Sequence, residues 1–156
     1  MPVGPCRDPA AGDFGEEGPD NVAYGMPAVA ITDTSNLFGA LEASEILSGA
    51  GIQPITGVTL PVMLAETAEP GRAARRELSG TLALLAKDEQ GYENLMKLTS
   101  RAFLGPEAGD FPHVPFDLVA EHAAGLICLT GGPAGVVNRL LVTGQRPAAQ
   151  SLMDRL

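Results

Sequence analysis

Residues 26–39 read Met-Pro-Ala-Val-Ala-Ile-Thr-Asp-Thr-Ser-Asn-Leu-Phe-Gly, and this stretch decides the fold. A short apolar run ends in a polar cluster, and apolar residues with helical spacing follow it. The pattern predicts a strand at 27–32, then a loop, then a helix at 36–49 that Ser35 or Asn36 caps. Because sites in α/β folds are built where such strands end, Asp33 is the first candidate functional residue.

The alternation of strand and helix continues along the chain. Further apolar runs predict strands at 51–58, 80–86 and 126–130. Helices or loops follow each of these strands in the predicted order. This order favours a parallel α/β architecture, either an open sheet or a barrel.

Spacing and capping residues predict the helices. Asp88 is expected to cap a long helix with one apolar, core-facing stripe. The residues of that stripe are Tyr92, Leu95, Met96, Thr99 and Phe103. Shorter helices are expected at 116–122 and 134–143, and a last helix is expected to start near Pro147 and to be still running at Leu156. A helix without a stop signal suggests a chain that has been cut.

The composition restricts the class of protein. With 156 residues, 45% of them hydrophobic, the chain can bury one core. A formal net charge of -9 disfavours direct binding of nucleic acid, because phosphates repel an acidic surface. No apolar run approaches the roughly 20 residues that span a membrane. Cys6 and Cys128 are too few for a disulfide framework, and Cys128 is expected to be a buried thiol, so the reducing cytoplasm is the expected compartment.

Residues 1–25 differ from the rest of the chain. They are rich in proline and glycine and show neither strand nor helix periodicity. We therefore predict an irregular or non-native leader before a folded unit at 26–156. A flexible leader is one explanation, and the loss of an upstream strand and helix to a frameshift or a mistaken start is the other.

Few residues could carry chemistry. His113 and His122 lack the spacing of a local zinc site and are expected to be structural or solvent-facing. The glycines at 131–135 lack the lysine of a phosphate-binding loop, so they are interpreted as a turn. Asp33 can either brace the loop that follows its strand or bind a metal, and the bracing role is slightly favoured.

Four segments together resemble a known family. They are residues 27–42, 49–57, 82–104 and 125–132, and in this order they resemble the N-terminal PHP (polymerase and histidinol phosphatase) domain of the bacterial DNA polymerase III alpha subunit. The resemblance is close over 26–142, loose over 143–156 and absent over 1–25. It implies a distorted (β/α) barrel, of which this chain would be a partial copy that lacks the first strand and is truncated at its C-terminus.

The resemblance also assigns motif residues, which are Thr32, Asp33, Asn36, Gly39 and Gly57. Metal-binding members of the superfamily carry a His after the aspartate and a Glu shortly after the glycine of the next strand. Thr34 and Thr59 occupy these two positions here, so Asp33 remains as the remnant of the early ligand set. One carboxylate cannot hold a multinuclear site, since each ion takes about four to six ligands. The resemblance thus implies a PHP domain that has lost its metal-dependent activity.

By resemblance, the parent protein is a DNA-directed DNA polymerase, a nucleotidyltransferase that uses magnesium in replication. This fragment alone is expected to be inactive and to need no cofactor. Its expected partners are the remaining polymerase domains and the proofreading exonuclease subunit, for which it would act as scaffold and docking surface, with no direct contact to nucleic acid or membrane. One alternative is a stand-alone PHP phosphoesterase, which would need more His and acidic ligands. Another is a fragment that is not expressed and whose unpaired edge makes it poorly soluble.

Overall fold

In the computed structural model, the residues described are 25–64, 80–106 and 111–156. Their centre is a five-stranded mixed sheet, whose main path has the order β1-β2-β3-β5. The strands are β1 (Ala28–Thr34), β2 (Gln53–Met63), β3 (Gly80–Ala86), β4 (Val114–Pro115) and β5 (Leu126–Leu129). The predicted leader at 1–25 lies almost wholly outside these residues.

The predicted parallel sheet is wrong for half of the strand pairs. β1 runs parallel to β2, and β4 runs parallel to the end of β2. β3 is antiparallel to both β2 and β5. An apolar run indicates a buried strand but carries no information on its direction, which only pairing decides.

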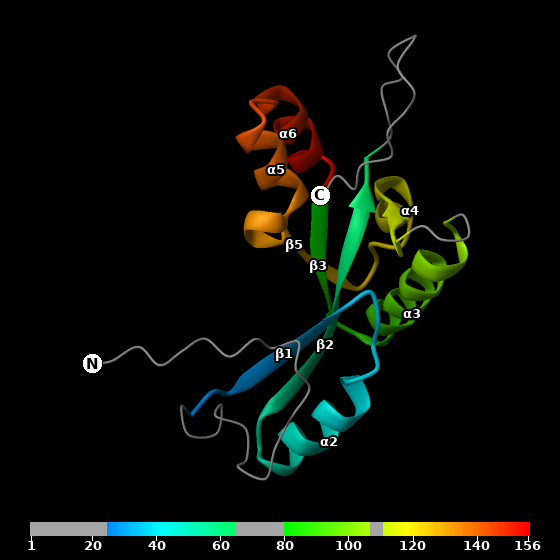
Figure 1. Ribbon diagram of the computed structural model, residues 1–156. Helices are drawn as coiled ribbons and strands as arrows, with labels where there is room; N and C mark the ends of the chain where they lie inside the picture. Colours follow the sequence, from blue (N-terminus) through cyan, green and yellow to red (C-terminus); the bar gives the residue numbers. More distant parts are fainter. Residues whose placement is uncertain (1–24, 65–79, 107–110) are drawn as a thin grey trace.

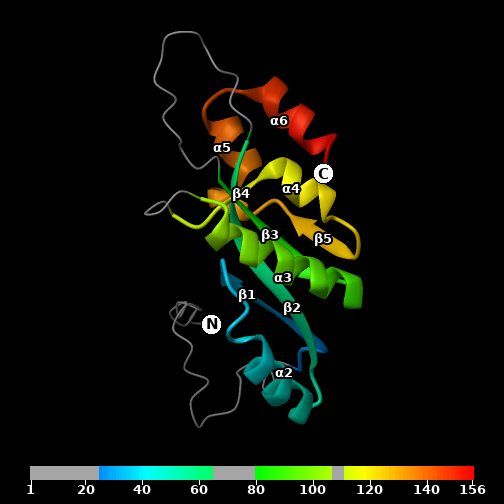
Figure 2. The ribbon, with the colours of Figure 1, turned by 90° about the vertical axis from the view of Figure 1, so that its right-hand side faces the viewer.

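The helices are α2 (Ala40–Gly49), α3 (Glu89–Leu104), α4 (Phe116–Glu121), the short 3₁₀ helix η1 (Gly132–Ala134), α5 (Val136–Val142) and α6 (Arg146–Met153). All the predicted helices exist. However, α2 starts four residues later than expected, and α6 ends at Met153 instead of continuing to Leu156. Both views show α3 and α4 against the same face of the sheet, with α2 beside β1 and β2 and with α5 and α6 at the opposite end (Figures 1 and 2).

The hydrophobic core lies between the sheet and α3. Alternate residues of β2 and β3 are fully buried on this face, among them Val58, Leu60 and Leu82. They pack with Leu95 and Leu98 of α3, as period-2 strands and a helical stripe require. α4, α5 and α6 each add buried apolar side chains to the same cluster.

The prediction of which face of α3 packs on the core is wrong. The buried stripe is shifted by one residue along the helix relative to the predicted stripe. The buried residues of the helix are Gly91, Asn94, Leu95, Leu98 and Ala102. Of the predicted stripe only Leu95 is among them, and Tyr92, Met96 and Phe103 are 40%, 41% and 57% exposed. The Asn94 side-chain amide donates to Ala124 O at 2.9 Å, and this polar contact helps to fix the rotation.

The face of the sheet that points away from α3 is less covered. Leu85 pairs with Ile127, and Ala83 pairs with Leu129, so these four side chains share that face. Ile127 and Leu129 are 48% and 50% exposed. The described part of the chain therefore buries one face of its sheet fully and the other only in part.

Candidate functional site

The candidate site lies where β1 ends and the chain enters α2. Asp33 Oδ2 accepts a hydrogen bond from Gly39 N–H at 3.2 Å, and Gly39 is the residue just before the helix. A Cβ at position 39 would lie 3.0 Å from the same oxygen, which is a tight contact. Glycine therefore lets the Asp33 carboxylate approach the backbone of residue 39 without crowding. Asp33 thus braces the loop between strand and helix, which is the role favoured from the sequence.

The predicted cap by Ser35 or Asn36 is wrong. Asn36 Oδ1 accepts from Phe38 N–H at 3.0 Å, and its amide donates to Thr34 O at 2.9 Å. The side chain of Asn36 therefore stabilises a local turn that delays the start of α2 to Ala40. The hydroxyl of Ser35 makes no hydrogen bond to the helix.

Thr34 and Thr59 lie opposite each other in the paired strands β1 and β2. Ser35 N–H donates to Thr59 O at 2.9 Å, and Thr59 Oγ1 donates to Thr32 O at 3.2 Å. The two positions where the resemblance expects metal ligands are therefore neighbours, and both carry neutral hydroxyls. Because successive side chains of a strand point to opposite faces, Asp33 and Thr34 point away from each other.

Gly57 is required by close packing within the sheet. It pairs with Thr32 on one side and with Leu85 on the other. A Cβ here would lie 2.6 Å from Leu85 Cδ2, 2.7 Å from Leu84 O and 2.9 Å from Thr32 Cγ2. The motif residues Thr32 and Gly57 therefore contact each other and set the spacing of β1 and β2.

Ser35 is a special residue that sequence reasoning treated only as a cap. Its φ of 60° is left-handed, which is uncommon for a residue other than glycine. The residue is 4% exposed, and its Oγ has no hydrogen-bond partner. Ser35 lies in a run of five polar residues, and nothing in that run singles it out for a left-handed φ. Asparagine and aspartate adopt this conformation more readily than serine does.

The histidines and Cys128 lie in local structural settings. His113 Nδ1 is 2.7 Å from Phe111 O, and His122 Nδ1 is 3.0 Å from Leu118 O, so both rings are held by nearby backbone. Cys128, expected to be buried, is only partly buried, and this partial burial raises the pKa of its thiol. Cys6 lies outside the described residues.

The donor set does not fit the metal centre of metal-binding PHP proteins. Within residues 25–64, 80–106 and 111–156, no three His, Cys, Asp or Glu side chains are grouped so that they could hold an ion. Asp33 is hydrogen-bonded at the entry to α2, and the positions beside it supply only the hydroxyls of Thr34 and Thr59. Neutral hydroxyls are poor ligands for zinc, which takes Cys, His or carboxylate groups.

Comparison with known proteins identifies the class. The PHP domain model matches residues 20–156, so the chain belongs to the PHP domain family. Its open mixed sheet and helices form a partial PHP-type (β/α) barrel that is not closed within the described residues. The resemblance found in the four sequence segments and the predicted fold class are thereby confirmed.

The curated relatives belong to one kind of protein, DNA polymerase III subunit alpha. That of Caulobacter vibrioides is 43% identical over 131 residues, which is 84% of this chain. Those of Treponema pallidum and Vibrio cholerae are 38% and 35% identical over 82% and 85% of the chain. In each case the match spans about 11% of the relative's length. In the described part of the chain, no helix has the length and apolar character needed to cross a membrane.

Proposed function

We propose that this chain is a segment of the alpha subunit of a replicative DNA polymerase, in which a metal-degenerate PHP domain acts as scaffold and as docking surface for the proofreading exonuclease subunit. Its relatives are named DNA polymerase III subunit alpha, and the chain spans about 11% of their length. The parent polymerase would extend DNA in the cytoplasm with magnesium bound by domains outside this chain.

The observation that carries the proposal is the placing of Asp33, Thr34 and Thr59. The two threonines stand side by side where ligands are expected, and the Asp33 carboxylate, on the other face of β1, holds the entry to α2. A site made of two neutral hydroxyls cannot balance the charge of zinc or manganese ions. This arrangement supports a role in assembly over phosphoester hydrolysis.

The surface supports a protein partner over nucleic acid. The chain carries a formal charge of -9, which repels a phosphate backbone. The outward side of α3 presents Tyr92, Met96 and Phe103 to solvent. Tyrosine, phenylalanine and methionine are enriched in protein interfaces, so this side of the domain suits a protein contact.

Two measurements on the purified chain test the proposal. Metal content after dialysis against zinc and manganese, together with hydrolysis of p-nitrophenyl phosphate, is expected to show neither bound metal nor turnover. Titration with the proofreading exonuclease subunit encoded by the same genome is expected to show a stable complex. Tightly bound metal with turnover would support the stand-alone phosphoesterase, and lack of binding to the exonuclease subunit would refute the docking role.

A further inference from the structure

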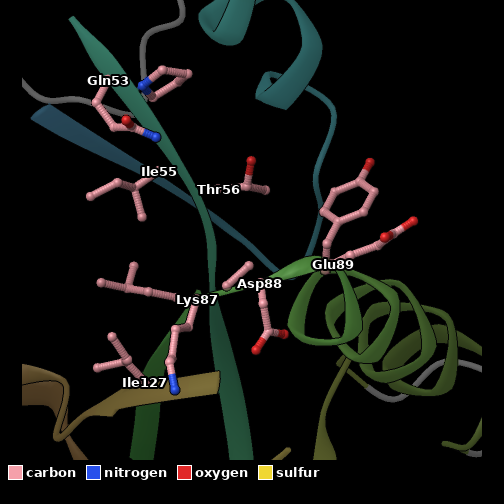
Figure 3. A pocket seen from close by; sticks show the side chains of 11 residues that line it. Gln53, Ile55, Thr56, Lys87, Asp88, Glu89 and Ile127 are labelled. Carbon is pink, nitrogen blue, oxygen red and sulfur yellow. The ribbon is translucent and has the colours of Figure 1, made fainter. Parts of the chain in front are cut away.

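β2 has a strand on both sides in its middle, but only on one side at its beginning. β1 pairs with residues 53–59, whereas β3 pairs only with residues 57–62. Among the described residues, no strand pairs with residues 53–56 on the β3 side. A hollow of about 560 Å³ opens there, between the start of β2, the end of β3, the start of α3 and Ile127 of β5 (Figure 3). We call this hollow the β2 notch.

The backbone of β2 turns unpaired groups toward the notch. Gln53 N–H donates to Pro27 O at 3.0 Å, and Thr59 O accepts from Ser35 N–H, so the odd-numbered residues of β2 face β1. The even-numbered residues face the other way, since backbone groups alternate along a strand. Pro54 therefore turns its carbonyl to the notch, and Thr56 turns its N–H there, beyond the last pair that β2 makes with β3, Gly57 with Leu85. An added strand can bond to these groups.

The side chains around the notch select the chemistry of that strand. Figure 3 shows Ile55, Ile127 and the Lys87 ammonium on one side of β2, with Thr56 and Glu89 on the other. Ile127 is half exposed, so it can accept an apolar contact. No carboxylate of the described residues forms a salt bridge with Lys87. The neighbouring Asp88 accepts a hydrogen bond from Gly91 N–H at 2.9 Å instead.

We infer that the partner inserts an extended segment into the β2 notch as an additional strand. Its backbone pairs with Pro54 and Thr56, an apolar side chain covers Ile55 and Ile127, and a carboxylate binds Lys87. The inference rests on the proposed docking function, because it takes the exonuclease subunit as the partner. The unpaired edge specifies an extended chain, and the unpaired cation specifies an acidic residue beside an apolar one.

Two substitutions test this inference in the full chain. Thr56→Pro removes the N–H that faces the notch, and Pro54 already places a proline ring on the same edge. Lys87→Glu reverses the charge. Affinity for the exonuclease subunit, measured by calorimetry, is expected to fall about tenfold or more for each variant. Arg146→Glu is the matched control, since Arg146 is exposed at the start of α6, outside both the notch and α3, and its variant should bind as the unmodified chain does.

Amide hydrogen exchange gives a second readout that does not depend on a variant. The Thr56 N–H is expected to be slowed when the exonuclease subunit is added, whereas the Ile55 N–H, which faces β1, should be protected already. If the unmodified chain binds the subunit and both notch variants bind equally well, the inference is wrong and the docking function stands. If the unmodified chain does not bind, both are wrong. Dimerisation of the chain that Thr56→Pro abolishes would assign the notch to a second copy and would also overturn the inference.

Discussion

Gly91 of α3 and Gly125 lie so close that a Cβ on Gly91 would stand 2.0 Å from the carbonyl oxygen of Gly125. The same turn accepts the Asn94 amide at Ala124 O, and Asp88 caps the helix through Gly91 N–H. These contacts fix both the position and the rotation of α3 at its first turn. The core face of the helix is therefore decided by a close backbone approach as well as by apolar residues.

Gly91→Ala should destabilise the protein, because the added methyl group must push α3 away from Gly125. Overpacking of this kind costs about 1–3 kcal/mol. The free energy of unfolding in urea measures the effect. Gly49→Ala is the matched control, since a Cβ there meets nothing within 4 Å, and it should be neutral or stabilising. Equal stability of the two variants would contradict the contact.

The rotation of α3 predicts unequal effects for two large apolar residues. Leu98 is fully buried, so Leu98→Ala should cost about 2–5 kcal/mol of unfolding free energy. Met96 is 41% exposed, so Met96→Ala should cost about 1 kcal/mol or less. Urea unfolding of both variants checks the order. A larger loss for Met96→Ala would restore the face expected from the sequence.

Asp33→Ala should weaken the entry to α2, because the Gly39 N–H loses its acceptor. Loss of a side-chain acceptor at a helix start costs about 0.5–2 kcal/mol. Asp33→Asn keeps an oxygen at the same place and should retain most of the stability, as thermal unfolding can measure. A loss in both variants that metal chelators reproduce in the unmodified chain would instead point to a bound ion.

Restoring the two missing ligand types should create weak metal binding. Thr34 and Thr59 are paired across β1 and β2, so Thr34→His with Thr59→Glu places an imidazole and a carboxylate together. Calorimetry with zinc is expected to detect binding in the double variant and none in either single variant. Adding Asp33→Asn should leave that affinity unchanged, because Asp33 points to the other face of the strand. A strong loss would show that Asp33 joins the site.

Ser35→Gly should stabilise the protein by about 1 kcal/mol. Glycine accepts a φ of 60° without strain, and the substitution also removes a buried hydroxyl that has no partner. Ser35→Ala removes the hydroxyl but keeps a Cβ at the left-handed φ. Urea unfolding of both variants therefore separates the contribution of the hydroxyl from that of the backbone conformation. Destabilisation by both variants would show that the hydroxyl has a partner, such as a bound water molecule.

The sequence predicts the elements well and their arrangement less well. The strand at 28–34 and the helix capped by Asp88 follow from strong apolar patterns and a clear cap. The direction of β3 does not follow, because an apolar run is the same in both directions. The apolar pattern alone does not settle the face of α3, since Tyr92 and Met96 are large and mostly hydrophobic, like Leu98. The contacts of Gly91 with Gly125 and of Asn94 with Ala124 decide between the two stripes.

The motif residues follow from the resemblance, and the structure shows how they lie. Thr32 pairs with Gly57 in the middle of β2, and Asp33 follows Thr32 near the end of β1. The left-handed Ser35 was not predictable, since neighbouring polar residues conceal a conformation that serine rarely adopts. The β2 notch also has no sequence signal, because it depends on where β3 stops pairing with β2.

The half-covered sheet face at Ile127 and Leu129 makes the unfolding free energy of this domain depend on whether another protein segment covers that face. Any protein segment that covers this face binds the folded chain and not the unfolded chain, so it raises the unfolding free energy by mass action. A ligand at 100 times its dissociation constant adds about 2.7 kcal/mol in this way. Single substitutions that unfold the isolated chain can therefore be tolerated inside an assembly, where the neighbour supplies the missing stability.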